Sequence, residues 1–170
     1  FQNRQITIKK RVSDILITTG GSDPCHFCLE FARQILLIHT GKSCPTNLSS
    51  SQIHNITFHI VVGKLNTDKE KLRRLAPALP LLQLHEAVSD MAALMEKCDL
   101  AVSAAGTTLY ELCALGIPSV SFTMADNQIP SAKAFHQEGA IPYIGDIRHA
   151  PDRVLENALS FIESMTRRSQ

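Results

Sequence analysis

The feature that most constrains this sequence is a repeated alternation of short apolar runs with longer segments that carry helix signals. Apolar runs, rich in β-branched and aliphatic residues, predict six strands at 14–19, 56–62, 81–84, 100–103, 119–122 and 141–144. Helical spacing and capping residues predict helices between them. Short, mostly apolar strands that alternate with helices indicate a parallel sheet covered on both faces. The predicted fold is therefore α/β, a Rossmann-like doubly wound parallel sheet of about six strands.

Local signals give the expected helix boundaries. Asp23-Pro24 predicts a helix with Asp as N-cap and Pro at its first position. Thr67-Asp68-Lys69-Glu70 has the pattern of a capping box, and Ser89 is the expected N-cap of the following helix. The polar stretch 40–55 is expected to be a long surface loop.

Length and composition exclude several classes of protein. A chain of 170 residues fits one domain, 1–170, that can fold without a disulfide or metal. The net charge of +1, no Trp and two Tyr argue against nucleic-acid binding. No apolar run approaches the ~18 residues of a transmembrane segment. The odd number of cysteines, five, favours a reducing compartment, so we expect a cytoplasmic protein.

The turn after the fourth expected strand is the strongest candidate for ligand binding. Small residues, Ser103-Ala104-Ala105-Gly106, lead directly into a helix, whose free N–H groups and positive end favour a phosphate. Thr107 and Thr108 add hydroxyl donors, and Glu111 suits a pair of ribose hydroxyls. The alternative is that Thr108 and Glu111 only form a capping box.

Three further turns are expected at the same carboxyl edge of the sheet, where such folds bind ligands. Gly20-Gly21-Ser22 permits close backbone approach, although it matches neither G-x-G-x-x-G nor the Walker loop. Asp126-Asn127-Gln128 could bind sugar hydroxyls, and the backbone of the turn 86–91 could pair with a base edge. For each turn the alternative is an ordinary capped helix start.

The pair Cys25-x-x-Cys28 at a helix start raises a redox or zinc hypothesis. No second C-x-x-C or H-x-x-x-H pair accompanies it, and Cys25 falls on the expected apolar stripe of the helix. His85 lies at the end of the third strand near the proposed site, but no Ser-His-Asp arrangement follows from the spacing. We therefore expect neither metal binding nor thiol chemistry.

The motifs also carry a family resemblance. Residues 90–118, with Ser103-Ala104-Ala105-Gly106-Thr107-Thr108 and Tyr110-Glu111-Leu112, and the later Asp126-Asn127-Gln128 resemble the C-terminal half of a family of enzymes. These are the UDP-sugar hydrolase of pseudaminic acid biosynthesis and the related spore-coat polysaccharide proteins. The lipid II N-acetylglucosaminyltransferase is more distantly similar, and all share the two-domain GT-B architecture. The similarity, including the motif around Gly20-Gly21, covers about 14–145.

The resemblance implies a site that binds UDP and the attached sugar without a metal. Val88 would offer its backbone to uracil, Glu111 would hold the ribose, and the turn 105–108 would hold the diphosphate. Asn127 and Gln128 would face the sugar or diphosphate. The full expected set is Gly20, Gly21, Ser22, Val88, Met91, Ser103, Ala105, Gly106, Thr107, Thr108, Glu111, Asn127 and Gln128.

The same resemblance implies that the catalytic base belongs to an N-terminal domain, so that no catalytic residue is expected in this chain. Residues 1–12, which begin at Phe1 without Met, are expected to be the remnant of an interdomain linker. The implied substrate is a UDP-2,4-diacetamido-2,4,6-trideoxy-sugar, to be hydrolysed. The sequence departs from the family where Ala105-Gly106 replaces Gly-Gly and Tyr110-Glu111-Leu112 replaces Trp-Glu-Arg. A donor-binding half of a glycosyltransferase and a non-catalytic nucleotide-binding module remain the alternatives.

Overall fold

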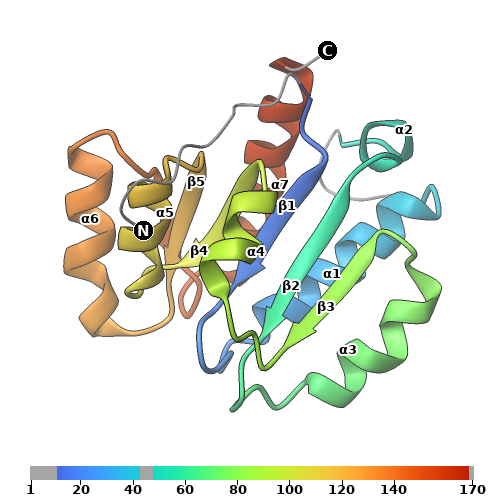
Figure 1. Ribbon diagram of the computed structural model, residues 1–170, viewed down its shortest axis with the longest axis horizontal. Coiled ribbons are helices and arrows are strands. Elements are labelled where there is room, and N and C mark those ends of the chain that lie inside the picture. The colour runs from blue at the N-terminus through green and yellow to red at the C-terminus, as the bar shows by residue number, and fades with distance from the viewer. Residues whose placement is uncertain (1–10, 43–47, 169–170) are drawn as a thin grey trace.

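The structure is a computed structural model that describes residues 11–42 and 48–168. A six-stranded parallel sheet has the strand order β3-β2-β1-β4-β5-β6 (Figure 1). The strands are β1 Asp14–Thr18, β2 Thr57–Val62, β3 Leu82–Glu86, β4 Leu100–Ala104, β5 Ser119–Thr123 and β6 Tyr143–Asp146. The α-helices are α1 Phe27–His39, α2 Ser50–Ile53, α3 Lys69–Leu75, α4 Met91–Lys97, α5 Thr108–Leu115, α6 Ile129–Gln137 and α7 Pro151–Arg168. Two 3₁₀ helices are η1 Ala76–Ala78 and η2 Asp126–Gln128.

This order confirms the predicted doubly wound sheet and fixes where a ligand can bind. The chain runs outward from β1 to β3, crosses the sheet through α4, and runs outward again from β4 to β6 (Figure 1). β1 and β4 are therefore neighbours, with Thr18 opposite Ser103 in the register. The order reverses between them, and the turns that follow both strands meet at the carboxyl edge of the sheet.

Two cores cover the two faces of the sheet. Alternate side chains of β1 divide between them, since Ile15 and Ile17 belong to the core with α1, α3 and α7, and Leu16 to the core with α4, α5 and α6. The first core is centred on an aromatic group, in which the ring centroids of Phe27 and Phe122 are 4.3 Å apart. These cores hold the sheet, and hence the turns at its carboxyl edge, in a fixed arrangement.

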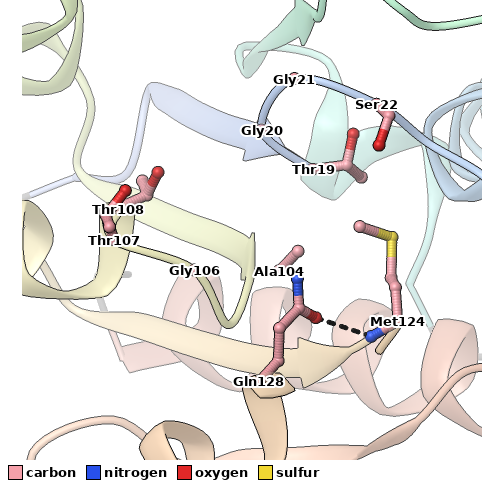
Figure 2. Close-up of a pocket in the computed structure, with 10 residues that line it drawn as sticks. All are labelled: Thr19, Gly20, Gly21, Ser22, Ala104, Gly106, Thr107, Thr108, Met124 and Gln128. Atoms are coloured by element: carbon pink, nitrogen blue, oxygen red, sulfur yellow. Dashed lines mark hydrogen bonds between the residues drawn. The ribbon is translucent and has the colours of Figure 1, made fainter. Parts of the chain in front are cut away.

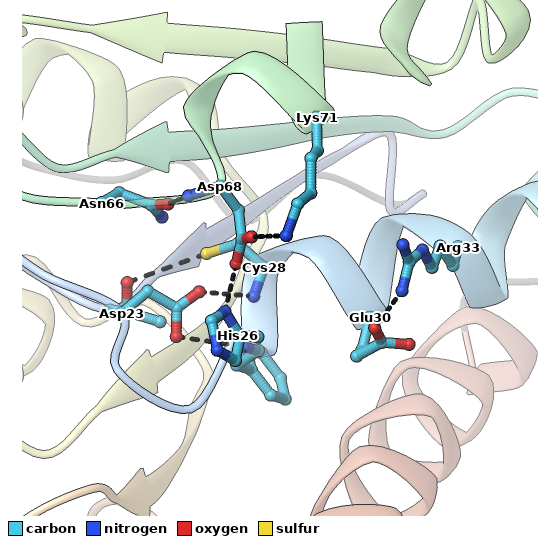
Figure 3. Close-up of polar contacts among 10 residues, drawn as sticks. Asp23, His26, Cys28, Glu30, Arg33, Asn66, Asp68 and Lys71 are labelled. Atoms are coloured by element: carbon cyan, nitrogen blue, oxygen red, sulfur yellow. Dashed lines mark hydrogen bonds and ion pairs between the residues drawn. The ribbon is translucent and has the colours of Figure 1, made fainter. Parts of the chain in front are cut away.

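The start of α1 differs from the prediction. Asp23 does cap the helix, but its carboxylate accepts the N–H groups of Phe27, at 2.9 Å, and of Cys28, at 2.8 Å, so the helix begins at Phe27 (Figure 3). His26 is left-handed, with φ 58°, and its ring contacts the buried carboxylate of Asp68. Cys25 therefore lies in the turn before the helix, not on its apolar stripe.

The starts of α3 and α4 also differ from the prediction, because in each case the N-cap is the residue after the predicted one. The capping box at 67–70 is not formed, because Asp68 is the N-cap of α3 and its carboxylate accepts Lys71 Nζ at 2.7 Å. Asp90, not Ser89, caps α4 by accepting the N–H of Ala93 at 2.9 Å.

The segment 40–55 is not entirely loop. It contains the short helix α2, where Gln52 Oε1 accepts the N–H of Ser49 at 2.8 Å, and Leu48 and Ile53 are buried in the first core. Residues 43–47 of the predicted loop, among them Cys44, and 1–10 of the predicted linker lie outside the described residues. No helix in the described ranges is long and apolar enough to cross a membrane.

Candidate functional site

A pocket of about 260 Å³ opens at the carboxyl edge of the sheet, where β1, β4 and β5 end (Figure 2). Each strand contributes residues at or just after its carboxyl end. The lining residues are Thr19, Gly20, Gly21, Ser22, Ala104, Gly106, Thr107, Thr108, Met124 and Gln128. The pocket thus lies at the reversal of strand order, where doubly wound folds bind ligands.

The turn after β1 is held in place by the segment after β2. Gly20 is left-handed, with φ +81°, and the carbonyl of Gly21 accepts the N–H of Leu65 at 2.9 Å. Gly63 packs directly against this backbone, because a Cβ built on Gly63 would lie 2.3 Å from the oxygen of Gly20. Only glycine fits such an approach, so Gly63 supports the wall of the pocket without lining it.

In the turn after β4, hydrogen bonds hold the backbone on both sides of Thr107 and Thr108. The N–H of Ala105 donates to Phe122 O at 2.8 Å, and the N–H groups of Leu109 and Tyr110 donate to the carbonyls of Gly106 and Thr107. Thr107 and Thr108 lie between these tethered positions, at the start of α5 and on the pocket wall. The first N–H groups of a helix have no acceptor within the helix, so they can bind an anion.

Gln128 forms the floor on the β5 side. Its Oε1 accepts the N–H of Met124 at 2.8 Å, which fixes the orientation of the amide (Figure 2). The amide nitrogen points toward Ala104 and is left as a donor on the pocket side. Among the described residues no charged side chain lines the pocket, so an anion there would be held by hydroxyls, amide N–H groups and the end of α5.

Residues 15–169 match the glycosyltransferase family 28 C-terminal domain. The chain belongs to this family. It is 30% identical over 158 residues to the spore coat polysaccharide biosynthesis protein SpsG of Bacillus subtilis, covering 93% of this chain and 43% of that protein. It is 31% identical over 127 residues to a Helicobacter pylori protein named pseudaminic acid cytidylyltransferase and UDP-2,4-diacetamido-2,4,6-trideoxy-beta-L-altropyranose hydrolase, covering 74% of this chain and 20% of that one.

Solved structures bear out the same fold. The Acinetobacter baumannii MurG structure superposes with a TM-score of 0.63 at 18% identity, over 95% of this chain and 45% of that one. Together with the match to a family's C-terminal domain, this likeness confirms the expected C-terminal half of a GT-B fold. This chain spans less than half the length of each of these proteins.

The pocket at the carboxyl edge brings together part of the set expected from the sequence. Seven of the expected residues line it, namely Gly20, Gly21, Ser22, Gly106, Thr107, Thr108 and Gln128. Ala105 is buried behind the turn, and Ser103 is buried in β4 with its hydroxyl donating to Ala104 O at 2.9 Å. Asn127 is exposed on η2, beside Gln128 but outside the pocket lining.

The remaining three expected residues lie at α4 and α5, away from the pocket lining. Val88 and Met91 pack against the second core, which also includes Leu109 of α5. Glu111 is half-buried on α5, and the helix has no side-chain cap hydrogen bond, so the alternative of a capping box is wrong. Ala87, just before Val88, is left-handed with φ 49°, a strained conformation for a residue that carries a Cβ.

Four residues that line or support the pocket are not among the site residues expected from the sequence. Ala104 lies within the small-residue stretch 103–106 and Thr19 directly precedes Gly20, so their positions alone could have included them. Met124 follows β5 and gave no signal. Gly63 could have been suspected as a glycine directly after a strand next to a Gly-Gly turn, but the contact is visible only in three dimensions.

The thiols of Cys25 and Cys28 and the rings of His59 and His85 lie outside the pocket lining. Burial raises the pKa of the Cys28 thiol well above its ordinary value and also raises that of Cys25, opposite to the shift a thiol oxidoreductase needs. His85 Nε2 lies 2.9 Å from His59 Nδ1 on a face of the sheet, and His59 Nε2 lies 2.9 Å from Asp14 Oδ1. Within the described residues no group of three or more His, Cys, Asp or Glu side chains could hold a metal ion.

Proposed function

We propose that this chain binds a UDP-sugar and is the nucleotide-sugar half of a GT-B enzyme. The observation that carries the proposal is the pocket at the junction of β1 and β4, where a Gly-Gly turn and the start of α5 face each other. Backbone N–H groups, hydroxyls and a helix N-terminus are the groups expected around a diphosphate. Membership of glycosyltransferase family 28 supports a nucleotide-sugar as the ligand.

The proposed ligand extends from the pocket along α5. The diphosphate lies on Thr107 and Thr108, the sugar lies toward Gln128 and Asn127, and the uridine lies toward Val88. In this arrangement Glu111, one turn into α5, accepts hydrogen bonds from the ribose hydroxyls. The strained Ala87 supports a backbone at Val88 that is held ready for a base edge.

For the whole protein we propose hydrolysis of a UDP-linked 2,4-diacetamido-2,4,6-trideoxy-sugar in pseudaminic acid or surface polysaccharide synthesis. The similarity to the Helicobacter pylori and Bacillus subtilis proteins supports this choice. Transfer of the sugar to an acceptor is the second candidate, favoured by the family name and by the MurG likeness of the fold. A nucleotide-binding module without catalysis is the third.

In the proposed mechanism this half of the enzyme stabilises the departing UDP. Negative charge that develops on the diphosphate oxygens is met by the N–H groups and hydroxyls at the start of α5, which need no rearrangement during the reaction. The base that activates water, or the acceptor, belongs to an N-terminal domain of the same polypeptide, and no metal takes part. We place the protein in the cytoplasm, which suits its free cysteines.

Titration calorimetry with UDP, UDP-N-acetylglucosamine, ADP and NAD tests the binding proposal. The expected result is saturable binding of both uridine nucleotides and weaker binding of ADP and NAD. A preference for NAD, or no response to UDP, would contradict it. In a separate assay the 170-residue chain, mixed with the acetamido UDP-sugar, should release no UDP at a useful rate, and robust release would show that the catalytic groups lie in this chain.

A further inference from the structure

Arg148 links two acidic residues from different segments, one of which, Asp126, lies two positions before the pocket residue Gln128. Arg148 lies in the loop between β6 and α7, and its guanidinium binds Asp146 in a bidentate manner, with Nε to Oδ1 at 3.0 Å and Nη2 to Oδ2 at 2.6 Å. The same Nη2 donates to Asp126 Oδ1 at 2.7 Å. Asp126 is the first residue of η2, whose last residue is Gln128.

The two carboxylates have different surroundings. Asp146 is 13% exposed, and hydrogen bonds from Arg148 lower its pKa to about 2, so it remains ionised at neutral pH and holds the guanidinium in a fixed orientation. The Asp126 side chain is 88% exposed, so packing does little to hold it in place. The ion pair with Arg148 is the side-chain contact that joins Asp126, and with it the start of η2, to the loop after β6. Ile147, next to Arg148, reinforces this attachment by donating its N–H to Thr123 O at 3.0 Å.

Fixing the start of η2 has consequences for its end. A 3₁₀ helix of three residues has few internal hydrogen bonds of poor geometry, so its position depends on its anchors. Two side-chain contacts hold it, the Arg148–Asp126 ion pair and the Gln128 amide, whose Oε1 accepts the N–H of Met124. At its other end η2 runs directly into α6, which begins at Ile129. Displacement of the first residue would move the amide that lines the pocket.

We propose that Arg148 is a positioning residue, which sets the orientation of the Gln128 amide toward the bound ligand through Asp126. The effect on the ligand rests on the proposed function. Arg148 itself does not line the pocket, so it acts through η2 and not by touching the nucleotide-sugar. It thereby couples the loop between β6 and α7 to ligand recognition.

Two variants remove the link from either side, Arg148→Gln and Asp126→Asn. Arg153→Gln is the matched control, since Arg153 is exposed on α7 and lines a separate groove with Tyr143 and Asn157. The first readout needs no ligand and is the hydrogen exchange of the Met124 amide by NMR, with the Phe58 amide of β2 as an internal reference. Both variants should speed exchange at Met124 and leave Phe58 unchanged, whereas the control should change neither.

The second readout is the affinity for UDP-N-acetylglucosamine, measured with and without Gln128→Ala. Loss of one hydrogen bond to the ligand corresponds to an affinity about 3- to 10-fold weaker, which we expect for Arg148→Gln in the otherwise wild-type chain. In the Gln128→Ala background the same substitution should have no further effect. A further loss there would mean that Arg148 contacts the ligand directly, and would overturn the positioning role.

The two readouts separate the two proposals. If the wild-type chain does not bind UDP-N-acetylglucosamine, the proposed function fails, and with it the effect of Arg148 on recognition. If the wild-type chain binds but Met124 exchange or affinity is unchanged in Arg148→Gln and Asp126→Asn, the positioning role alone fails.

Discussion

A β-carbon on Gly63 would lie 2.3 Å from the carbonyl oxygen of Gly20. The two residues follow neighbouring parallel strands, β2 and β1, and the absence of a side chain at Gly63 allows their turns to touch. The wall of the proposed diphosphate pocket thus depends on a residue outside it.

Gly63→Ala should therefore disturb both stability and the pocket. Because the obstructing atoms are backbone, they cannot move aside as a flexible side chain would, and we expect a loss of about 1–3 kcal/mol in the free energy of unfolding. Urea denaturation measures this loss. Gly21→Ala is the control, because a Cβ there meets nothing within 4 Å, and it should leave stability nearly unchanged. Equal stability of the two variants would show that the turn after β1 adapts freely.

Asp23 should contribute to stability as the cap of α1. Its buried carboxylate accepts two backbone N–H groups, from Phe27 and Cys28, and its removal leaves both donors without this partner. Asp23→Ala should lower the free energy of unfolding by about 2 kcal/mol in thermal or urea denaturation. Asp90→Ala is the comparison, because Asp90 caps α4 through one N–H at an exposed position. A larger loss at Asp90 would contradict this ranking.

Stability should depend on pH through His85. Burial, followed by the charges of His59 and Lys97, lowers the pKa of His85 below its ordinary value of 6.5. Below a pH of about 6.5 the unfolded chain therefore binds more protons at His85 than the folded chain does. The free energy of unfolding decreases as the pH falls from about 6.5 through the lower folded-state pKa of His85. Urea midpoints between pH 7.5 and 5 should decline less steeply in His85→Gln, whereas an unchanged slope would exclude His85 as the source.

Glu111 should contribute to nucleotide affinity and not to the capping of α5. Glu111→Ala removes the proposed acceptor of the ribose hydroxyls and should weaken UDP binding by about 1.5–3 kcal/mol for each charge-assisted hydrogen bond lost. Calorimetry measures the change, with exposed Glu156→Ala on α7 as the control. The variant should also discriminate less between UDP and 2′-deoxy-UDP. Wild-type affinity in Glu111→Ala would remove Glu111 from the site.

The alternation of apolar and amphipathic segments was enough to predict the sheet, because the strands are short and bounded by turn residues, and the four central strands, β1, β2, β4 and β5, are largely buried. The small-residue turns Gly20-Gly21 and Ala104-Gly106 were likewise recognisable, since close approach to a ligand requires small residues there. The pocket lies between these two turns, which the order of the strands brings together.

What the sequence did not reveal depends on contacts between distant residues. The later start of α1 accompanies a left-handed His26 whose partner, Asp68, is 42 positions away. Asp68, not Thr67, is the N-cap of α3, and the Glu70 carboxylate accepts a hydrogen bond from Arg73, so the capping box between Thr67 and Glu70 does not form. Local patterns cannot weigh such competition, and they could not show that Gly63 supports the turn at Gly20.

Amide chemical shifts of the ¹⁵N-labelled chain during titration with UDP test the central claim most directly. We predict saturable shifts that cluster at Gly20, Gly21, Thr107 and Thr108, the residues around the proposed diphosphate, and extend along α5 to Glu111. Shifts confined to the groove of Tyr143 and Arg153, or no shifts at saturating UDP, would contradict the account.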